Sequence, residues 1–252
     1  MRRIRVLSYN IQAGVQTRSY RDYVTQSWKH VLPHRERQAN LDRISGLLHS
    51  YDIVGLQEVD SGSLRSGFID QTAYLAKQAG FPHWHKQVNR SLGKLAQYSN
   101  GLLSHLRPTS ITEHRLPGLP GRGAILSNFG LEDSSSLTVC ILHLALGRRA
   151  RMRQVDYIGQ LVAECPYLII MGDLNCGLGS PELELLMDRL DLWEPICRAS
   201  TFPSWQPKRK IDHILVSRSL GIEKARVLDC PGSDHLPISL DVLLPKEIEV
   251  AA

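Results

Sequence analysis

Short, mainly apolar runs of four to six residues recur along the chain. Runs of this length between turn-forming residues are typical of buried strands. We therefore predict strands over residues 4–9, 53–56, 137–142, 167–171, 211–216 and 238–243. No run approaches the roughly 18 consecutive apolar residues that a membrane-spanning helix needs.

Apolar residues spaced three or four positions apart alternate with these runs, as at Leu41, Ile44 and Leu48. This spacing predicts helices, which we expect over residues 35–51, 72–79, 149–164 and 182–190. Alternating strands and helices indicate an α/β fold, which we expect to consist of two packed sheets with the helices outside. A single doubly wound parallel sheet is the alternative.

No Gly/Ser linker or low-complexity tract divides the chain. We therefore expect one domain over residues 1–252, with a core over residues 4–244 and a tail over 245–252. The five cysteines lie far apart and no apolar leader opens the chain. These features favour reduced thiols and a cytoplasmic location, with peripheral membrane association as the alternative. We expect a monomer.

Basic residues outnumber acidic ones by 30 to 25, which gives a formal charge of +5. Arginine supplies 22 of the 30 basic residues, and its planar guanidinium suits phosphate oxygens. The densest cluster is formed by Arg148, Arg149, Arg151 and Arg153. It is interpreted either as a solvated helix face or as a surface that attracts a phosphate-bearing substrate.

Polar residues of a narrow set of types stand where the predicted strands end. They are Asn10, Glu58, His143, Asp173 with Asn175, Asp212 with His213, and Asp234 with His235. One such ending has an ordinary explanation, because Asp and Asn favour turns. Six endings rich in Asp, Glu, Asn and His instead indicate a site mounted on strand ends, where side-chain geometry is held firmly.

The residue types at these ends narrow the chemistry. Carboxylate and carboxamide oxygens suit Mg²⁺, with Mn²⁺ as an alternative. No cysteine occurs among them, which argues against a thiolate zinc site. The sequence has no phosphate-binding P-loop, no dinucleotide fingerprint and no serine nucleophile elbow. Imidazoles beside a divalent metal, without a covalent nucleophile, favour attack by water on phosphorus.

The ordered series of motifs SYNIQ, DIVGLQEVD, NGLLSH, LHL, MGDLN, TFPSW, KIDHILVS and SDHLPI resembles the endonuclease/exonuclease/phosphatase superfamily. The resemblance runs from Asn10 to Ile238 and implies a four-layer α/β/β/α sandwich of two mixed sheets with outer helices. It also implies a Mg²⁺-dependent site at the edge of the two sheets.

On the metal side, the resemblance implies that Glu58 is the principal Mg²⁺ ligand. Asn10 would lie beside it and help to bind metal or phosphate, and Asp234 would be a second carboxylate near the metal.

On the catalytic side, the resemblance implies that Asp173 orients or activates the attacking water and that Asn175 holds the phosphate. His235 would contact a non-bridging phosphate oxygen or act as the base, with Asp212 fixing its tautomer. His143 would protonate the leaving oxygen. Its LHL context differs from that of apurinic-site endonucleases, so abasic-site repair is disfavoured.

Four further residues are candidates for substrate binding: Asn100, Thr201, Trp205 and Arg122. Trp205 could stack on a base or sugar, although a core position is an equal alternative. Residues 12–38, with Tyr20, Trp28 and His30, would form either a substrate-side loop or a surface loop with its own aromatic cluster.

The leading functional hypothesis is a metal-dependent phosphodiester hydrolase that resembles a nuclease, with nucleic acid as its partner. A phosphodiesterase or phosphatase acting on a phospholipid headgroup or small phosphoester is the alternative. A non-catalytic phosphate-binding protein on the same fold is less favoured, because Glu58, His143, Asp173 and His235 are all present.

Overall fold

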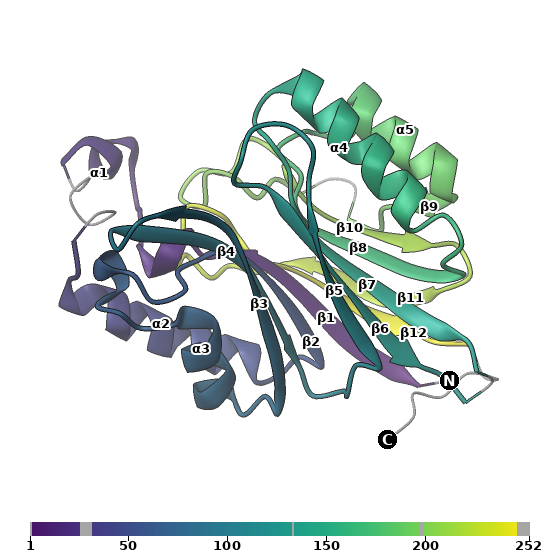
Figure 1. Cartoon of the computed structure of the whole chain (residues 1–252), viewed down its shortest axis with the longest axis horizontal. Helices are drawn as coiled ribbons and strands as arrows, with labels where there is room; N and C mark the ends of the chain where they lie inside the picture. Colours follow the sequence, from purple (N-terminus) through teal and green to yellow (C-terminus); the bar gives the residue numbers. More distant parts are fainter. Residues whose placement is uncertain (1, 26–31, 133, 197–198, 246–252) are drawn as a thin grey trace.

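The computed structural model describes residues 2–25, 32–132, 134–196 and 199–245, so Trp28, His30 and most of the expected tail lie outside it. Two six-stranded sheets pack face to face, with helices on both outer faces (Figure 1). The expected α/β/β/α sandwich is therefore confirmed, and the alternative of one doubly wound sheet is wrong. In the described part of the chain, no helix is long and apolar enough to cross a membrane.

The first sheet contains both ends of the described chain and has the strand order β11-β12-β1-β2-β4-β3. Its strands are β1 (Arg3–Asn10), β2 (Ile53–Val59), β3 (His83–Leu92), β4 (Ala96–Ser104), β11 (Gly221–Val227) and β12 (Ile238–Leu243). Only β1 and β2 pair in parallel. Helices α2 (Arg35–Leu48) and α3 (Gln71–Ala79) cover its outer face, and the short α1 (Tyr20–Thr25) precedes them (Figure 1).

The second sheet has the strand order β5-β6-β7-β8-β10-β9. Its strands are β5 (Ser110–Arg115), β6 (Gly123–Gly130), β7 (Ser136–His143), β8 (Tyr167–Asp173), β9 (Leu192–Trp193) and β10 (Asp212–Ser217). Only β7 and β8 pair in parallel. Helices α4 (Arg148–Leu161) and α5 (Pro181–Leu190) cover its outer face (Figure 1).

The central core lies between the sheets and is built by strand alternation. In β1, Ile4 and Val6 join the core between the sheets, whereas Leu7 and Tyr9 join the core under α2. The two sheets approach closely at Gly55, where an added Cβ would lie 2.9 Å from Met171. Since successive strand residues alternate between the two faces, Asn10 shares the face of Ile4 and Val6.

Three long strands, β3, β5 and β11, have no signature in the apolar pattern. Each lies at an edge of its sheet. Only one residue of β3 is buried, and none of β5 or β11. An edge strand packs against less of the core, so few of its positions need to be apolar. The apolar pattern does not predict the strands β4 and β6 either, because Gly, Ser and Asn interrupt their apolar runs.

Candidate active site

Three polar side chains stand in one row at the end of the second sheet. His143 pairs with Asp173 across β7 and β8, and Asp173 pairs with Asp212 across β8 and β10. Each lies two residues from a core residue of its own strand, which is Ile141, Met171 or Ile214, and so shares the face toward the first sheet. The fold therefore brings these predicted residues together.

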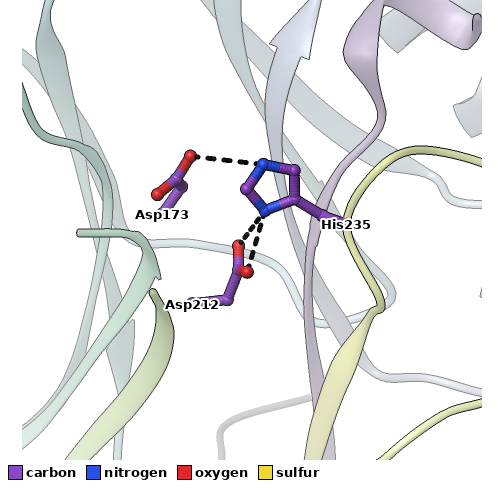
Figure 2. Close-up of side chains that lie close together, drawn as sticks. All are labelled: Asp173, Asp212 and His235. Atoms are coloured by element: carbon purple, nitrogen blue, oxygen red, sulfur yellow. Dashed lines mark hydrogen bonds and ion pairs between the residues drawn. The ribbon is translucent and has the colours of Figure 1, made fainter. Parts of the chain in front are cut away.

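His235 faces this row from the loop between β11 and β12. Its Nδ1 lies 2.8 Å and 3.1 Å from the two carboxylate oxygens of Asp212, and its Nε2 lies 3.8 Å from Oδ2 of Asp173 (Figure 2). The Thr201 hydroxyl donates to Asp212 over 2.5 Å. Burial alone would lower the pKa of His235, but the carboxylates of Asp212 and Asp173 outweigh it and hold this pKa well above its usual value.

Asp173 is fixed by donors on both sides. Nδ2 of Asn10 donates to Oδ2 of Asp173 over 3.1 Å, and the backbone N–H of Asn175 donates to Oδ1 over 3.0 Å. Burial raises the pKa of Asp173 to about 7, with Asp212 and Glu58 adding to the shift against the opposing charge of His235. The carboxylate therefore lies poised between its two protonation states near neutral pH.

Glu58 reaches the site because β2 is irregular there. The pairing of β2 with β4 shifts between Leu56 and Val59, and Glu58 has a φ of 56°, a strained value for a residue other than glycine. Bulges of this kind redirect a side chain. The carboxylate oxygen lies 3.9 Å from Nε2 of His143, with 32% of the side chain exposed. Its burial and the nearby Asp234 raise the pKa of Glu58.

His143 is held as a neutral imidazole. Burial, together with the charges of Arg122 and His235, keeps its pKa well below the usual value. Nη1 of Arg122 lies 3.4 Å from Nδ1 of His143, and a guanidinium can only donate. Nδ1 is therefore the acceptor, and the proton is on Nε2, which lies 3.5 Å from Oδ2 of Asp173.

The donor set suits a hard divalent cation. Four carboxylates, those of Glu58, Asp173, Asp212 and Asp234, surround the site, against the cationic His235 and Arg122. Oxygen donors of this kind are those that Mg²⁺ and Mn²⁺ prefer. Asp173, Asp212 and His235 offer ligand atoms within 4.8 Å of one another. However, Asp212 and His235 already bind each other, which leaves Glu58 as the carboxylate better placed for a metal.

The other polar residues expected in the site form hydrogen bonds with backbone carbonyls or with a neighbouring hydroxyl. Nδ2 of Asn175 donates to the Leu144 carbonyl over 2.9 Å, and Oδ1 of Asp234 accepts from the Ser233 hydroxyl over 3.1 Å. Nδ2 of Asn100 crosses between the sheets to the Gly123 carbonyl over 3.0 Å. In the described ranges, Oδ1 of Asn100 is buried without a hydrogen-bond partner.

Trp205 packs against the segment expected to form a loop. Its ring lies edge-on to Tyr20 of α1, with centroids 5.3 Å apart. Phe202 of the same TFPSW motif lies 4.9 Å from the His235 ring. The motif therefore links residues 12–25 to the catalytic histidine candidate through its aromatic side chains.

A cavity of about 510 Å³ extends from Glu58 and includes residues that the sequence analysis does not find. Arg90 and Tyr98 line it together with Arg122, Leu119 and Leu146. Arg90 and Tyr98 come from β3 and β4, the two neighbouring strands that the apolar pattern does not reveal. Without those strands, no sequence signal places either residue near Glu58.

Comparison with solved structures supports the fold. A family protein from Bacteroides thetaiotaomicron has a TM-score of 0.72 at 15% identity, covering 97% of this chain and 98% of that one. The mannosyl-6-phosphatase of B. thetaiotaomicron VPI-5482 has a TM-score of 0.70 at 16% identity, covering 96% and 100%. The human Nocturnin catalytic domain with bound sulfate has a TM-score of 0.72 at 17% identity, covering 96% and 94%. At identities this low, the similarity of the structures shows a shared fold and nothing further.

No curated protein sequence matches the chain significantly. A family model, however, matches residues 7–235, a span that includes the first and last motifs of the site. Members of that family are generally hydrolases of phosphoester bonds and commonly use divalent metals. Because the match spans nearly the whole chain, the protein belongs to the endonuclease/exonuclease/phosphatase family.

Proposed function

We propose that the protein is a Mg²⁺-dependent hydrolase of phosphodiester bonds, with Mn²⁺ as an alternative metal. One observation carries this proposal: the bonded series Thr201–Asp212–His235 ends on Asp173, opposite Glu58 and His143. A protein that only binds phosphate has no need of an imidazole oriented by a buried carboxylate beside a second carboxylate of raised pKa.

Glu58 and Asn10 would hold the metal, with Asp234 contributing to the negative field beside them. When bound, the cation would polarise the phosphoryl group and offset its charge. The strained backbone at Glu58 supports this assignment, since such strain concentrates at functional sites.

Asp173 is the group best placed to take a proton from the attacking water, because Asn10 and the backbone of Asn175 fix both of its oxygens. His235 keeps its Nδ1 proton on Asp212 and directs Nε2–H to a non-bridging phosphate oxygen. His143, with its proton on Nε2, donates a hydrogen bond to the leaving oxygen. Attack forms the new P–O bond as the bond to the leaving oxygen breaks; the proton of the water passes to Asp173, and the leaving oxygen takes its own proton from solvent.

The test uses hydrolysis of bis(p-nitrophenyl) phosphate by the full chain with Mg²⁺, Mn²⁺ or EDTA. We expect Asp173→Asn and His235→Gln each to lower kcat/KM by about 10² to 10⁴, the usual effect of a positioned acid–base group. His85→Gln is the matched control, because His85 pairs with Glu113 on the surface. Full activity in both site variants, or activity that EDTA leaves unchanged, would overturn the proposal.

A further inference from the structure

The two most exposed large apolar side chains in the described chain lie on the same cavity as Glu58. Leu119 is 85% exposed and Leu146 is 76% exposed, and both line the cavity of about 510 Å³. A third exposed leucine, Leu92, lines the adjoining cavity of about 640 Å³, which shares Arg90 and Arg122 with the first. Exposed apolar groups gathered at one place mark an interaction surface.

Buried polar contacts hold both leucine-bearing loops in place. Gln154 of α4 is fully buried, and its side chain accepts from the Ala145 backbone and donates to the Pro117 carbonyl. Arg151, itself bound to Glu182, donates to the carbonyls of Ala145 and Leu146. Gln154 therefore holds the loop between β5 and β6 next to the loop before α4, and the leucine of each loop remains exposed.

Cationic side chains surround these leucines. Arg90, Arg115 and Arg122 line the two cavities, and Glu58 is the only acidic residue lining either of them within the described ranges. None of these three arginines forms an ion pair with a carboxylate in the part of the chain that the structure describes. The charges of Arg90 and Arg115 are therefore available to an anionic partner, whereas Arg122 lies against His143 and acts on Glu58.

The pairing of apolar tips with unneutralised arginines fits one partner best. Leucines at loop tips insert at the boundary between headgroups and acyl chains, while nearby arginines attract anionic headgroups. A nucleic acid would use the arginines but leave Leu119 and Leu146 in water. A nucleic acid also favours stacking on aromatic rings, and among the residues that the structure describes Tyr98 is the one aromatic residue lining these cavities.

We propose that the loops over residues 116–122 and 144–147, with Arg90 and Arg115, form a docking surface for an anionic phospholipid bilayer. Docking through this surface turns the cavity of Glu58 toward the headgroups. This inference rests on the proposed function, and it assigns phosphodiesters of lipid headgroups as the substrate class.

Vesicle co-sedimentation of the full chain in EDTA tests docking without requiring hydrolysis. We expect binding to phosphatidylcholine vesicles containing phosphatidylglycerol to be at least about tenfold tighter than to pure phosphatidylcholine. The double variant Leu119→Ser/Leu146→Ser should lose about tenfold or more of that affinity. Leu185→Ser, at a 39% exposed leucine of α5, should bind like the native chain.

Arg90→Gln/Arg115→Gln should weaken binding to the anionic vesicles several-fold and leave binding to neutral vesicles unchanged. Melting curves of all variants confirm that each remains folded. Hydrolysis of the soluble diester bis(p-nitrophenyl) phosphate is measured in parallel, so the two proposals fail separately.

A native chain that hydrolyses the soluble diester but does not bind anionic vesicles would overturn the docking surface and leave the proposed function standing. Vesicle binding that survives loss of both leucines would also overturn it. Tighter binding to a single-stranded oligonucleotide than to vesicles, sensitive to the arginines but not to the leucines, would replace the bilayer with a nucleic acid. Leucine-dependent vesicle binding, with no Mg²⁺-dependent hydrolysis of either the soluble diester or the vesicle phospholipids, would support docking and overturn the proposed function.

Discussion

Both carboxylate oxygens of Asp212 contact the imidazole of His235, at 2.8 Å and 3.1 Å from its Nδ1. The same carboxylate accepts a hydrogen bond from the Thr201 hydroxyl, so two side chains from separate segments fix the imidazole. This arrangement keeps a proton on Nδ1 and leaves Nε2 facing Asp173. The pKa of His235 should therefore depend directly on the charge of Asp212.

Asp212→Asn should therefore lower the pKa of His235 toward the usual value of about 6.5. The raised pKa means that the stabilisation from the charged imidazole is complete below about pH 6.5 and is lost as pH rises through the raised pKa. NMR titration of the imidazole carbons in EDTA measures the shift. Urea unfolding should show the native chain losing its advantage over the variant as the pH rises. An unchanged pKa in the variant would contradict this account.

Glu58→Gln should abolish most of the thermal stabilisation that Mg²⁺ gives the native chain. A ligand that binds only the folded state at about 100 times its Kd stabilises by about 2.7 kcal/mol, and the amide removes the charge that we assign to the metal. Differential scanning calorimetry with and without Mg²⁺ measures the difference. Glu113→Gln, at a carboxylate paired with His85 on the surface, is the control. Equal Mg²⁺ shifts in native and Glu58→Gln chains would remove Glu58 from the metal site.

Gly55→Ala should destabilise the fold by about 1–3 kcal/mol, the usual cost of overpacking a core. Its new Cβ would lie 2.9 Å from Met171 and 3.0 Å from Ile141, between the two sheets. Gly46→Ala in α2 is the matched control, because no atom lies within 4 Å of its added Cβ. There the change should stabilise by up to about 1 kcal/mol through helix propensity. Equal free energies of unfolding for the two variants would argue against close contact of the sheets at Gly55.

Asp60→Asn should cost about 3–5 kcal/mol, because it leaves a buried arginine without its charge partner. The Asp60 carboxylate accepts from Nε of Arg65 over 2.5 Å and from the hydroxyls of Ser63 and Ser66, with none of its side chain exposed. It thereby organises the loop that directly follows Glu58. Denaturant unfolding measures the loss, which Arg65→Met on the same background should partly restore.

Asp156→Asn gives the matched comparison for that prediction. Asp156 pairs with Arg189 on the surface, with 56% of its side chain exposed. Exposed pairs contribute about 0–1 kcal/mol. A loss at Asp60 no larger than the loss at Asp156 would show that the buried network does not hold the loop.

Much of the fold follows from the sequence because burial imposes a pattern. The strands β1, β7, β8, β10 and β12 contribute to the core between the sheets, and their apolar runs reveal them. The edge strands β3 and β5 bury at most one residue each, so packing places little constraint on their sequence. A residue that such a strand places in the site, such as Arg90 of β3, therefore cannot be predicted from the apolar pattern.

The site was predictable where it depends on strand ends and not where it depends on loops. His143, Asp173 and Asp212 fall in one row because strand pairing aligns them. The arginine cluster of α4 shows the limit. Two of its members, the largely buried Arg151 and the exposed Arg148, pair with the buried carboxylate of Glu182. A cluster of arginines in the sequence therefore does not predict which of them face a ligand. The loops that bring cations together in the structure have no periodic sequence pattern that would predict them.

The pairing of β1 with β12, which joins Arg3 to Leu243, has a consequence during synthesis on the ribosome. After β1 emerges, its edge stays open until β12 has been synthesised more than 200 residues later, and His235 emerges just ahead of β12. A stalled nascent chain therefore lacks both the imidazole of the site and the strand that closes the first sheet. Long-range pairing of this kind also slows folding, so the site can be complete only after β12 has emerged.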